Sequence, residues 1–339
     1  LWLLSTMLMH ANNLQIGKAT LVDKNTSEGC INIQFHISWE NSWRTSSEPN
    51  NWDGVWLFVK YKNVSDGNWY HATLSNTNSN HVTGSQGSAA TISIAPGGTG
   101  AVYYRSQDGK GTFSSSSVKL RWDYTTNGLS NNVTNEVSEI KVFGIEMCYV
   151  PQGAFYVGSG GTESNHFYTY GSNNPYQITS ENQISLGSTV GSLTWTTDYN
   201  SGTPDAPVPT SFPKGYNSFW CMKYEITQEQ YAYFLNTLTA TQKSTRFMNS
   251  FNRYGNYIKL VNGVYGCDGN NNNILNEADD GQTIACNYLS WADGTAYSDW
   301  SGMSPMTELE FEKACRGTLA PVANERAWGN TNIIGATGI

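Results

Sequence analysis

The chain has 339 residues, a length that suggests two domains of roughly 150 residues each. Its 19 lysine and arginine residues against 27 acidic residues give a net charge of -8. Proteins that grip phosphate backbones need the opposite balance, so nucleic acid is excluded as an expected partner. Aromatic residues make up 13% of the chain, enough to build large cores, which excludes intrinsic disorder.

The first eleven residues are predicted to be the remnant of a secretory signal peptide (residues 1–11). The apolar run LWLLSTMLM is followed by the small residue Ala11 and by polar Asn12. It is shorter than the ~20 residues of a membrane span but matches the apolar core of an export signal. The alternative is a buried N-terminal strand. Because no other segment is apolar enough for a membrane helix, we expect a secreted or cell-surface protein without a transmembrane anchor.

Six cysteines are widely spaced, and no two of them stand in a CxxC pair. They are Cys30, Cys148, Cys221, Cys267, Cys286 and Cys315. Zinc-knuckle and thioredoxin-like sites therefore lack their motif. Export permits disulfides, but the sequence cannot choose among the pairings, and isolated buried thiols are the alternative.

Residues 12–147 are predicted to form an all-β antiparallel sandwich. Residues 31–39 alternate apolar and polar side chains, as a strand with one buried face does. The pattern returns at 55–61 and 118–124, and residues 138–147 resemble a closing strand. Turns rich in Gly, Asn and Ser separate these runs, which is typical of an antiparallel sandwich.

Tryptophans cluster beside polar loops in this half, at Trp43, Trp52, Trp56 and Trp69. They have two interpretations, a surface that stacks sugars or the ordinary core and rim of a sandwich. We take Trp43, Trp52 and Trp56 as candidate carbohydrate-binding residues. Nothing in this half resembles a catalytic constellation.

Three segments of the second half begin with a helix-capping pattern, a hydroxyl residue followed three positions later by Gln, Asp or Glu. The pairs are Thr227 with Gln230, Ser290 with Asp293, and Thr307 with Glu310. Apolar residues follow at helical spacing: Tyr231, Phe234, Leu235 and Leu238; Ala292, Ala296 and Trp300; Leu309, Phe311 and Ala314. Each cap is worth about 1 kcal/mol. We therefore expect Glu308, Glu310 and Glu312 to be structural rather than catalytic.

The second half resembles the formylglycine-generating enzyme family, also called sulfatase-modifying factor domains. The resemblance starts with PQGAFYVG at 151–158 and continues with the K-x-E-I-T helix start at 223–231 and with LSWADG at 289–294. The most specific run is MTELEFEKACRG at 306–317, similar to the family's P-T-E-A-E-W-E-x-A-x-R-G. The tripeptide WGN follows at 328–330, so the blocks occur in the family's order.

The resemblance implies that residues 148–339 form an α+β domain with the C-type-lectin-like formylglycine-generating-enzyme fold, truncated at its C-terminus. The family's calcium ligands and paired active-site cysteines lie downstream of WGN, so we assign no catalytic residue. In the family those cysteines hold copper, and the enzyme uses O2 as the oxidant to convert a peptide cysteine to formylglycine. Copper is therefore expected only if such a pair lies beyond residue 339. The chain also departs from the family at Ser304, where arginine is usual.

An Asn-rich insertion between Cys267 and Ile284 is a candidate calcium loop. Asp268, Asn270, Asn272, Asn276 and Asp279 take positions 1, 3, 5, 9 and 12 of an EF-hand-like pattern. The pattern is imperfect, because position 6 lacks glycine, position 12 lacks glutamate and no clear helix precedes the loop. The alternative is an Asn-rich surface loop. We take Asp268, Asn270, Asn272 and Asp279 as the candidate calcium ligands.

All five histidines precede residue 167, which excludes a Ser-His-Asp or Cys-His apparatus within the later half. HExxH, GxSxG and a P-loop are also absent, while a pair of carboxylates for glycoside hydrolysis stays open. We expect a non-catalytic binding or assembly module whose partner is a protein, a peptide or surface carbohydrate. The alternative is a formylglycine-generating oxidase with its active-site cysteines beyond residue 339.

Overall fold

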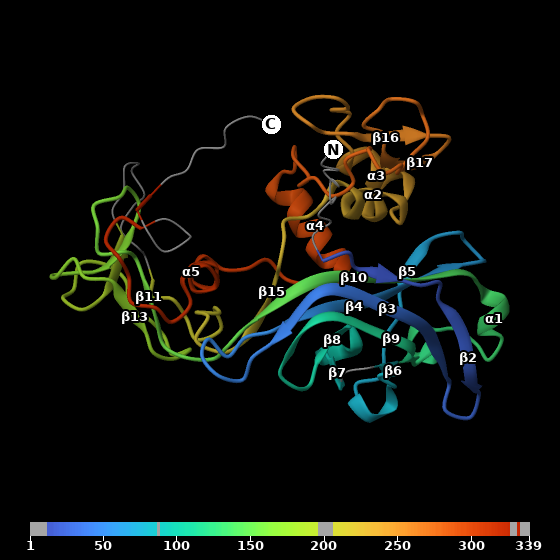
Figure 1. The fold of residues 1–339 in the computed structure, drawn as a ribbon, viewed down its shortest axis with the longest axis horizontal. Helices are drawn as coiled ribbons and strands as arrows, with labels where there is room; N and C mark the ends of the chain where they lie inside the picture. Colours follow the sequence, from blue (N-terminus) through green and yellow to red (C-terminus); the bar gives the residue numbers. More distant parts are fainter. Residues whose placement is uncertain (1–11, 87–88, 196–205, 326–330, 333–339) are drawn as a thin grey trace, which may run out of the picture. The chain divides into compact units, whose positions relative to one another are not determined.

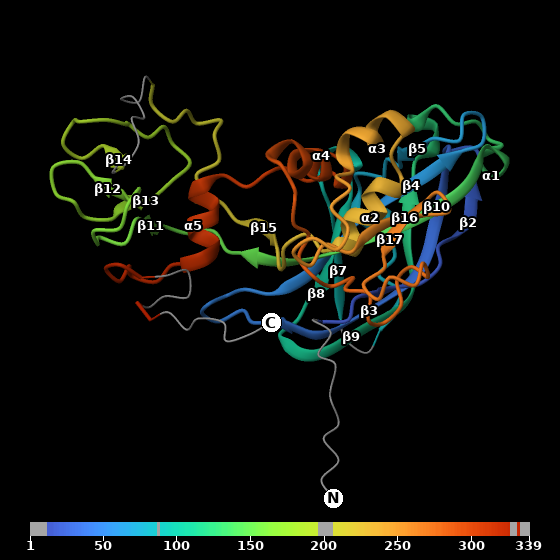
Figure 2. The same ribbon diagram turned by 90° about the horizontal axis from the view of Figure 1, so that it is seen from above.

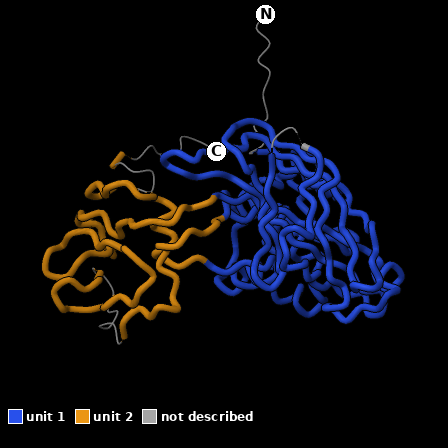
Figure 3. Tube along the Cα trace, turned by 90° about the horizontal axis from the view of Figure 1, so that it is seen from below, with its two compact units in different colours: residues 1–148, 222–305 blue, residues 149–221, 306–339 orange. Residues whose placement is uncertain are grey.

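A computed structural model describes residues 12–86, 89–195, 206–325 and 331–332 (Figure 1). The chain divides into two compact units: unit 1 contains residues 1–148 and 222–305, and unit 2 contains residues 149–221 and 306–339 (Figure 3). The chain passes between the units three times: within β10 (Val137–Val150), within β15 (Phe219–Met222) and between residues 305 and 306. The predicted signal remnant and the WGN tripeptide lie outside the described residues.

Unit 1 contains two antiparallel sheets. One has the order β1 (Gln15–Ile16), β3 (Cys30–Arg44), β9 (Gly109–Trp122) and β6 (Ser85–Gln86), with β2 (Thr20–Asn25) also pairing with β3. The other continues from β10 through β4 (Asp53–Asn63) and β8 (Ala101–Arg105) to β7 (Ala90–Ile94), and β5 (Trp69–His71) pairs with β4. Short connecting helices are η1 (Asn78–Asn80), η2 (Pro96–Gly98), η3 (Tyr124–Asn127) and α1 (Val133–Glu136).

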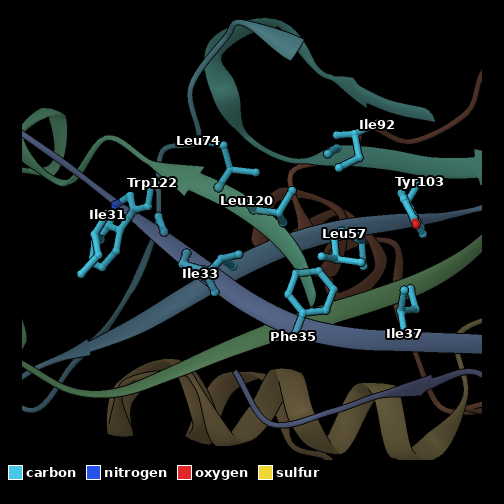
Figure 4. Close-up of a cluster of buried hydrophobic side chains, with 14 of the residues drawn as sticks. Ile31, Ile33, Phe35, Ile37, Leu57, Leu74, Ile92, Tyr103, Leu120 and Trp122 are labelled. Atoms are coloured by element: carbon cyan, nitrogen blue, oxygen red, sulfur yellow. The ribbon is translucent and has the colours of Figure 1, made fainter. Parts of the chain in front are cut away.

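The two sheets enclose one hydrophobic core, which confirms the predicted sandwich (Figure 4). The alternating side chains of β3 and its neighbour β9 bury one face, and the facing residues come from β4, β7 and β8 of the other sheet. The core side chains include Ile31, Ile33, Phe35, Ile37, Trp39, Leu57, Tyr103, Leu120 and Trp122. The predicted strands at 31–39, 55–61, 118–124 and 138–147 lie largely within β3, β4, β9 and β10.

Unit 1 also includes a helical layer that follows in sequence after residue 222 (Figure 2). Its elements are α2 (Gln228–Asn236), α3 (Ala240–Arg246), β16 (Ile258–Val261), β17 (Val264–Cys267) and α4 (Trp291–Ser301). The Trp300 ring lies edge-on to Phe58 of β4 and to Phe143 of β10, with distances between ring centroids of 4.9 Å and 5.0 Å. The second sheet therefore buries both of its faces along β4, which explains the nearly continuous apolar run of that strand.

The three predicted caps are confirmed. The side chains of Thr227, Ser290 and Thr307 each accept a hydrogen bond from the backbone N–H three residues later. The backbone N–H of each cap residue donates the reciprocal bond of the capping box to the side chain of that later residue. A fourth capping box, Thr239 with Gln242, begins α3. Of the apolar positions in α5 (Glu308–Arg316), Leu309 is buried together with Lys313, whereas the Phe311 side chain is 55% exposed.

Unit 2 has a smaller core and short strands. These are β11 (Phe155–Val157), β12 (Phe167–Thr169), β13 (Tyr176–Ile178) and β14 (Leu193–Trp195), paired as β11 with β13 and β12 with β14. Leu309 of α5 packs with Phe155, Val157 and Ile178 in this core. Within the family-like segment at 151–158, the strand β11 begins only at Phe155.

The division into domains 12–147 and 148–339 stays a prediction. Residues 222–305 belong to the same compact unit as the sandwich strands, although they lie far from these strands along the chain. Among the described residues, no helix has the length and apolar character that crossing a bilayer requires.

Candidate functional site

The predicted calcium loop follows β17, and its first candidate ligand, Asp268, is fully buried. One oxygen accepts the Asn272 backbone N–H at 2.9 Å, and the other accepts the Asn273 N–H at 3.0 Å and Lys259 Nζ at 2.7 Å. Burial raises the pKa of Asp268, but the bonds from Lys259 and the two N–H groups outweigh it and lower the pKa. Asp268 therefore already serves as the structural centre of the turn.

Three other carboxylates of the loop lie close together in space. Oxygens of Glu277, Asp279 and Asp280 lie within 4.8 Å of one another. Asn270 Nδ2 donates to Glu277 Oε2 at 3.3 Å and to Asp279 Oδ1 at 3.2 Å, and Asn272 Nδ2 donates to Glu277 Oε2 at 2.5 Å. The structure thus brings together three of the four candidate ligands, Asn270, Asn272 and Asp279.

This oxygen-rich group suits a hard cation such as calcium. Because the amide nitrogens now face the carboxylates, cation binding would require both asparagine amides to turn their oxygens inward. The spacing pattern missed Glu277 and Asp280, which do not fall at the ligand positions of an EF-hand-like loop. Their signal in the sequence was the acidic end of the loop, Glu277 with Asp279 and Asp280.

The three candidate carbohydrate-binding tryptophans have different surroundings. Trp56 is buried and donates its indole N–H to the Ser301 carbonyl at 2.8 Å, within the contact between β4 and α4. Lys223 Nζ lies 4.6 Å from the centroid of the Trp43 ring, and the Arg44 guanidinium lies 3.9 Å from that of Trp52. These rings pack against side chains of their own chain, and a role in sugar binding stays a prediction.

The most specific family-like run, residues 306–317, forms a structural network in unit 2. Arg316 donates through Nε to Glu325 at 2.6 Å and through Nη1 to the carbonyls of Tyr156 and Gly158 and to Glu312. Glu312 Oε1 also accepts the Gly158 N–H at 2.6 Å. The E-x-x-x-R spacing therefore places an acid and a base one helical turn apart, where both fasten the end of β11.

Glu312 and its neighbour in the helix, Lys313, have shifted pKa values. Burial raises the pKa of Glu312, while the Gly158 N–H and Arg316 oppose the shift. Lys313 is fully buried and donates to the carbonyls of Gly215 and Tyr216; burial lowers its pKa to about 8, against the attraction of Glu181. The charged groups of the motif thus hold backbone in place, as expected for Glu310 and Glu312.

Burial disfavours the thiolate form of several described cysteines. Burial raises the pKa of Cys267 and of Cys286 to about 12, and it also raises the pKa of Cys221 and Cys315. Since the thiolate is the nucleophile and the metal ligand, these thiols are poor candidates for either role. Within the described part of the chain no disulfide is present, so the predicted disulfides are not confirmed.

Comparison with known proteins agrees with this reading of the motifs. The model of one family, the sulfatase-modifying factor enzyme 1-like domain, matches residues 141–336. No curated protein and no solved structure shows significant similarity to the chain. The match covers all the family-like blocks at 151–158, 223–231, 289–294, 306–317 and 328–330.

Proposed function

Because the chain belongs to the family of sulfatase-modifying factor enzyme 1-like domains, we propose that it uses this domain as a non-catalytic binding or assembly module. We place the protein outside the cytoplasm, secreted or at the cell surface, on the strength of the apolar run at residues 1–9. The partner is a protein or peptide, or a surface carbohydrate. The domain would have the C-type-lectin-like fold that the family resemblance implies.

One observation carries the proposal: four of the five charged residues of the most specific motif are already engaged in holding the backbone. Glu310 closes a capping box, Glu312 and Arg316 fasten β11, and Lys313 bonds two carbonyls. A group that must bind or activate a substrate needs a free lone pair or proton directed outward. This use of the motif favours a scaffold that presents loops.

The described residues offer no ready-made pair of thiolates for the copper of a formylglycine-generating oxidase. Burial raises the pKa of Cys267 and Cys286 to about 12, and it also raises the pKa of Cys221 and Cys315. We therefore derive no oxidative step through copper, and the oxidase alternative depends on residues beyond 339.

The experiment that tests the function has two arms. In the first, a peptide containing CxPxR is incubated with the copper-loaded full-length protein and O2, and aldehyde formation is followed with a hydrazide probe and by mass spectrometry. We expect no aldehyde, with an authentic formylglycine-generating enzyme as the positive control. In the second, intact cells are treated with protease, which should degrade the protein before a cytoplasmic marker. Aldehyde formation, or protection in intact cells, would overturn the proposal.

We also propose that the loop around Asp279 binds calcium, supported by the convergence of Glu277, Asp279 and Asp280. Calcium stabilises a protein that binds it only when folded, so the melting temperature should rise with millimolar calcium and fall back with EGTA. The double variant Glu277→Gln/Asp279→Asn should lose this response, whereas the exposed control Asp108→Asn should keep it. A melting temperature that EGTA leaves unchanged would contradict the proposal.

A further inference from the structure

Unit 1 has an exposed tyrosine, Tyr254, at a position whose backbone conformation disfavours bulky side chains. Residues 253–256 form a tight turn in which the Asn256 N–H donates to the Arg253 carbonyl at 3.0 Å. Both central residues have positive φ, 49° at Tyr254 and 77° at Gly255, as a type I′ turn requires. Asparagine followed by glycine is the usual choice there, because bulky side chains strain this conformation.

The same chain follows the usual preference elsewhere. Among the described non-glycine residues with positive φ, all are asparagine or aspartate except Ser117, Tyr254 and Tyr288. The two tyrosines contact each other, with ring centroids 6.5 Å apart and planes inclined by 35°. Two strained aromatic residues therefore meet at one place.

Burial does not compensate for the strain at Tyr254, because its side chain is 85% exposed. The turn beneath it is nevertheless firmly held. Gln228, fully buried at the start of α2, donates to the Gly255 carbonyl at 2.7 Å and accepts the Tyr257 N–H at 2.7 Å. Asn287 Nδ2 donates to the Tyr254 carbonyl at 2.8 Å. These hydrogen bonds thus hold the turn in place and fix the backbone position from which the Tyr254 ring projects into solvent.

A cation completes the surface. The Arg253 guanidinium lies 5.9 Å from the centroid of the Tyr288 ring. Among the residues that the structure describes, its side chain has no hydrogen bond and no ion pair. In a chain of net charge -8, an exposed guanidinium without a carboxylate partner remains available to an external anion.

We propose that Tyr254, Tyr288 and Arg253 form a binding site for an acidic sugar of the uronate class. The flat C–H face of a pyranose packs on an exposed tyrosine ring, and a guanidinium pairs with a carboxylate through two parallel hydrogen bonds. The pre-organised turn lowers the entropy that binding costs. This site rests on the binding role proposed above and names its ligand class, at residues other than the candidate tryptophans.

The test uses the full chain and trigalacturonate, with binding measured by calorimetry and by saturation-transfer NMR. Tyr254→Asn installs the residue that the turn prefers, so it should weaken binding about tenfold or more while the melting temperature stays equal or rises. Tyr254→Phe should retain binding. Tyr170→Asn, a substitution of an exposed tyrosine in unit 2, is the matched control and should have no effect.

The charge requirement is tested separately. Methyl-esterified trigalacturonate with the wild type, and trigalacturonate with Arg253→Gln, should each bind several-fold more weakly. The proposal is overturned if trigalacturonate does not bind, if Tyr254→Asn binds it unchanged, or if a tetraglutamate peptide binds equally well, which would assign the surface to protein ligands. None of these outcomes bears on the aldehyde assay, so failure of the sugar site and failure of the binding-module role are distinguishable.

Discussion

Replacing Arg316 with methionine should unfold unit 2 at much milder denaturant concentrations than the wild type requires. The substitution leaves Glu325 and Glu312 without their cation and the carbonyls of Tyr156 and Gly158 without their donor. Breaking a buried ion pair by removing one partner costs about 3–5 kcal/mol. Because Arg316 and Glu325 are almost fully buried, solvent screening should reduce this cost little.

Hydrogen exchange read by mass spectrometry can localise the effect. We expect faster exchange in β11 and α5, with the sandwich strands unchanged. Glu308→Gln, at an exposed position of the same helix, is the control. Adding Glu312→Gln to Arg316→Met should restore part of the loss, since it removes one uncompensated charge. An Arg316→Met protein with wild-type exchange in α5 would contradict the role assigned to this arginine.

Replacing Lys60 with methionine should stabilise unit 1 at neutral pH. Lys60 is only 8% exposed, on β4 beneath α4, with its Nζ 5.6 Å from the centroid of the Trp300 ring. Burial lowers its pKa from 10.5 to about 8, against the attraction of Asp299. At about 1.4 kcal/mol per pKa unit, the charged form destabilises the folded state by roughly 3 kcal/mol below pH 8.

The dependence on pH has a definite sign. Between the folded pKa of about 8 and the ordinary 10.5, the unfolded chain binds more protons than the folded one, so wild-type stability rises with pH. The advantage of Lys60→Met should therefore be largest at pH 7 and small at pH 10.5. Urea unfolding at several pH values measures it, with the exposed Lys110→Met as control. A pH-independent difference would contradict this account.

A second readout comes from His71, whose pKa is lowered to about 4 by burial and by the nearby charge of Lys60. In Lys60→Met the charge is gone, so NMR titration should show the pKa of His71 moving upward. A purely packing effect of the methionine would leave the His71 titration where it was.

The sequence predicted the local features and missed those that depend on which surfaces meet. Alternation located β3, and the hydroxyl-to-acid spacing located three helix starts, because strands and caps depend on residues close in the chain. The burial of Trp56 could not be read in this way. An apolar pattern marks a buried face but not its partner, here Ser301 of a helix 245 residues away.

The candidate sites show the same limit. The EF-hand-like pattern marked the loop in which Glu277, Asp279 and Asp280 gather, yet Glu277 and Asp280 join this carboxylate group through the path of the backbone rather than through template spacing. In the sequence, Tyr254 could not be distinguished from an ordinary loop tyrosine, because the identity of one residue does not reveal that its φ is positive. The dipeptide Tyr254-Gly255 within an Asn-rich segment was the one available clue, and it became informative only with the dihedral angles.

The shared packing of α4 and the sandwich has a practical consequence for dissecting this protein. The boundary at which the family match begins, residue 141, cuts β10 in mid-strand. A fragment started there would retain Phe143 and Trp300 but lose Phe58, the third ring of their contact, together with the whole strand that carries it. A fragment of this chain that contains the family domain with its aromatic contacts intact should therefore begin before β4 rather than at the homology boundary.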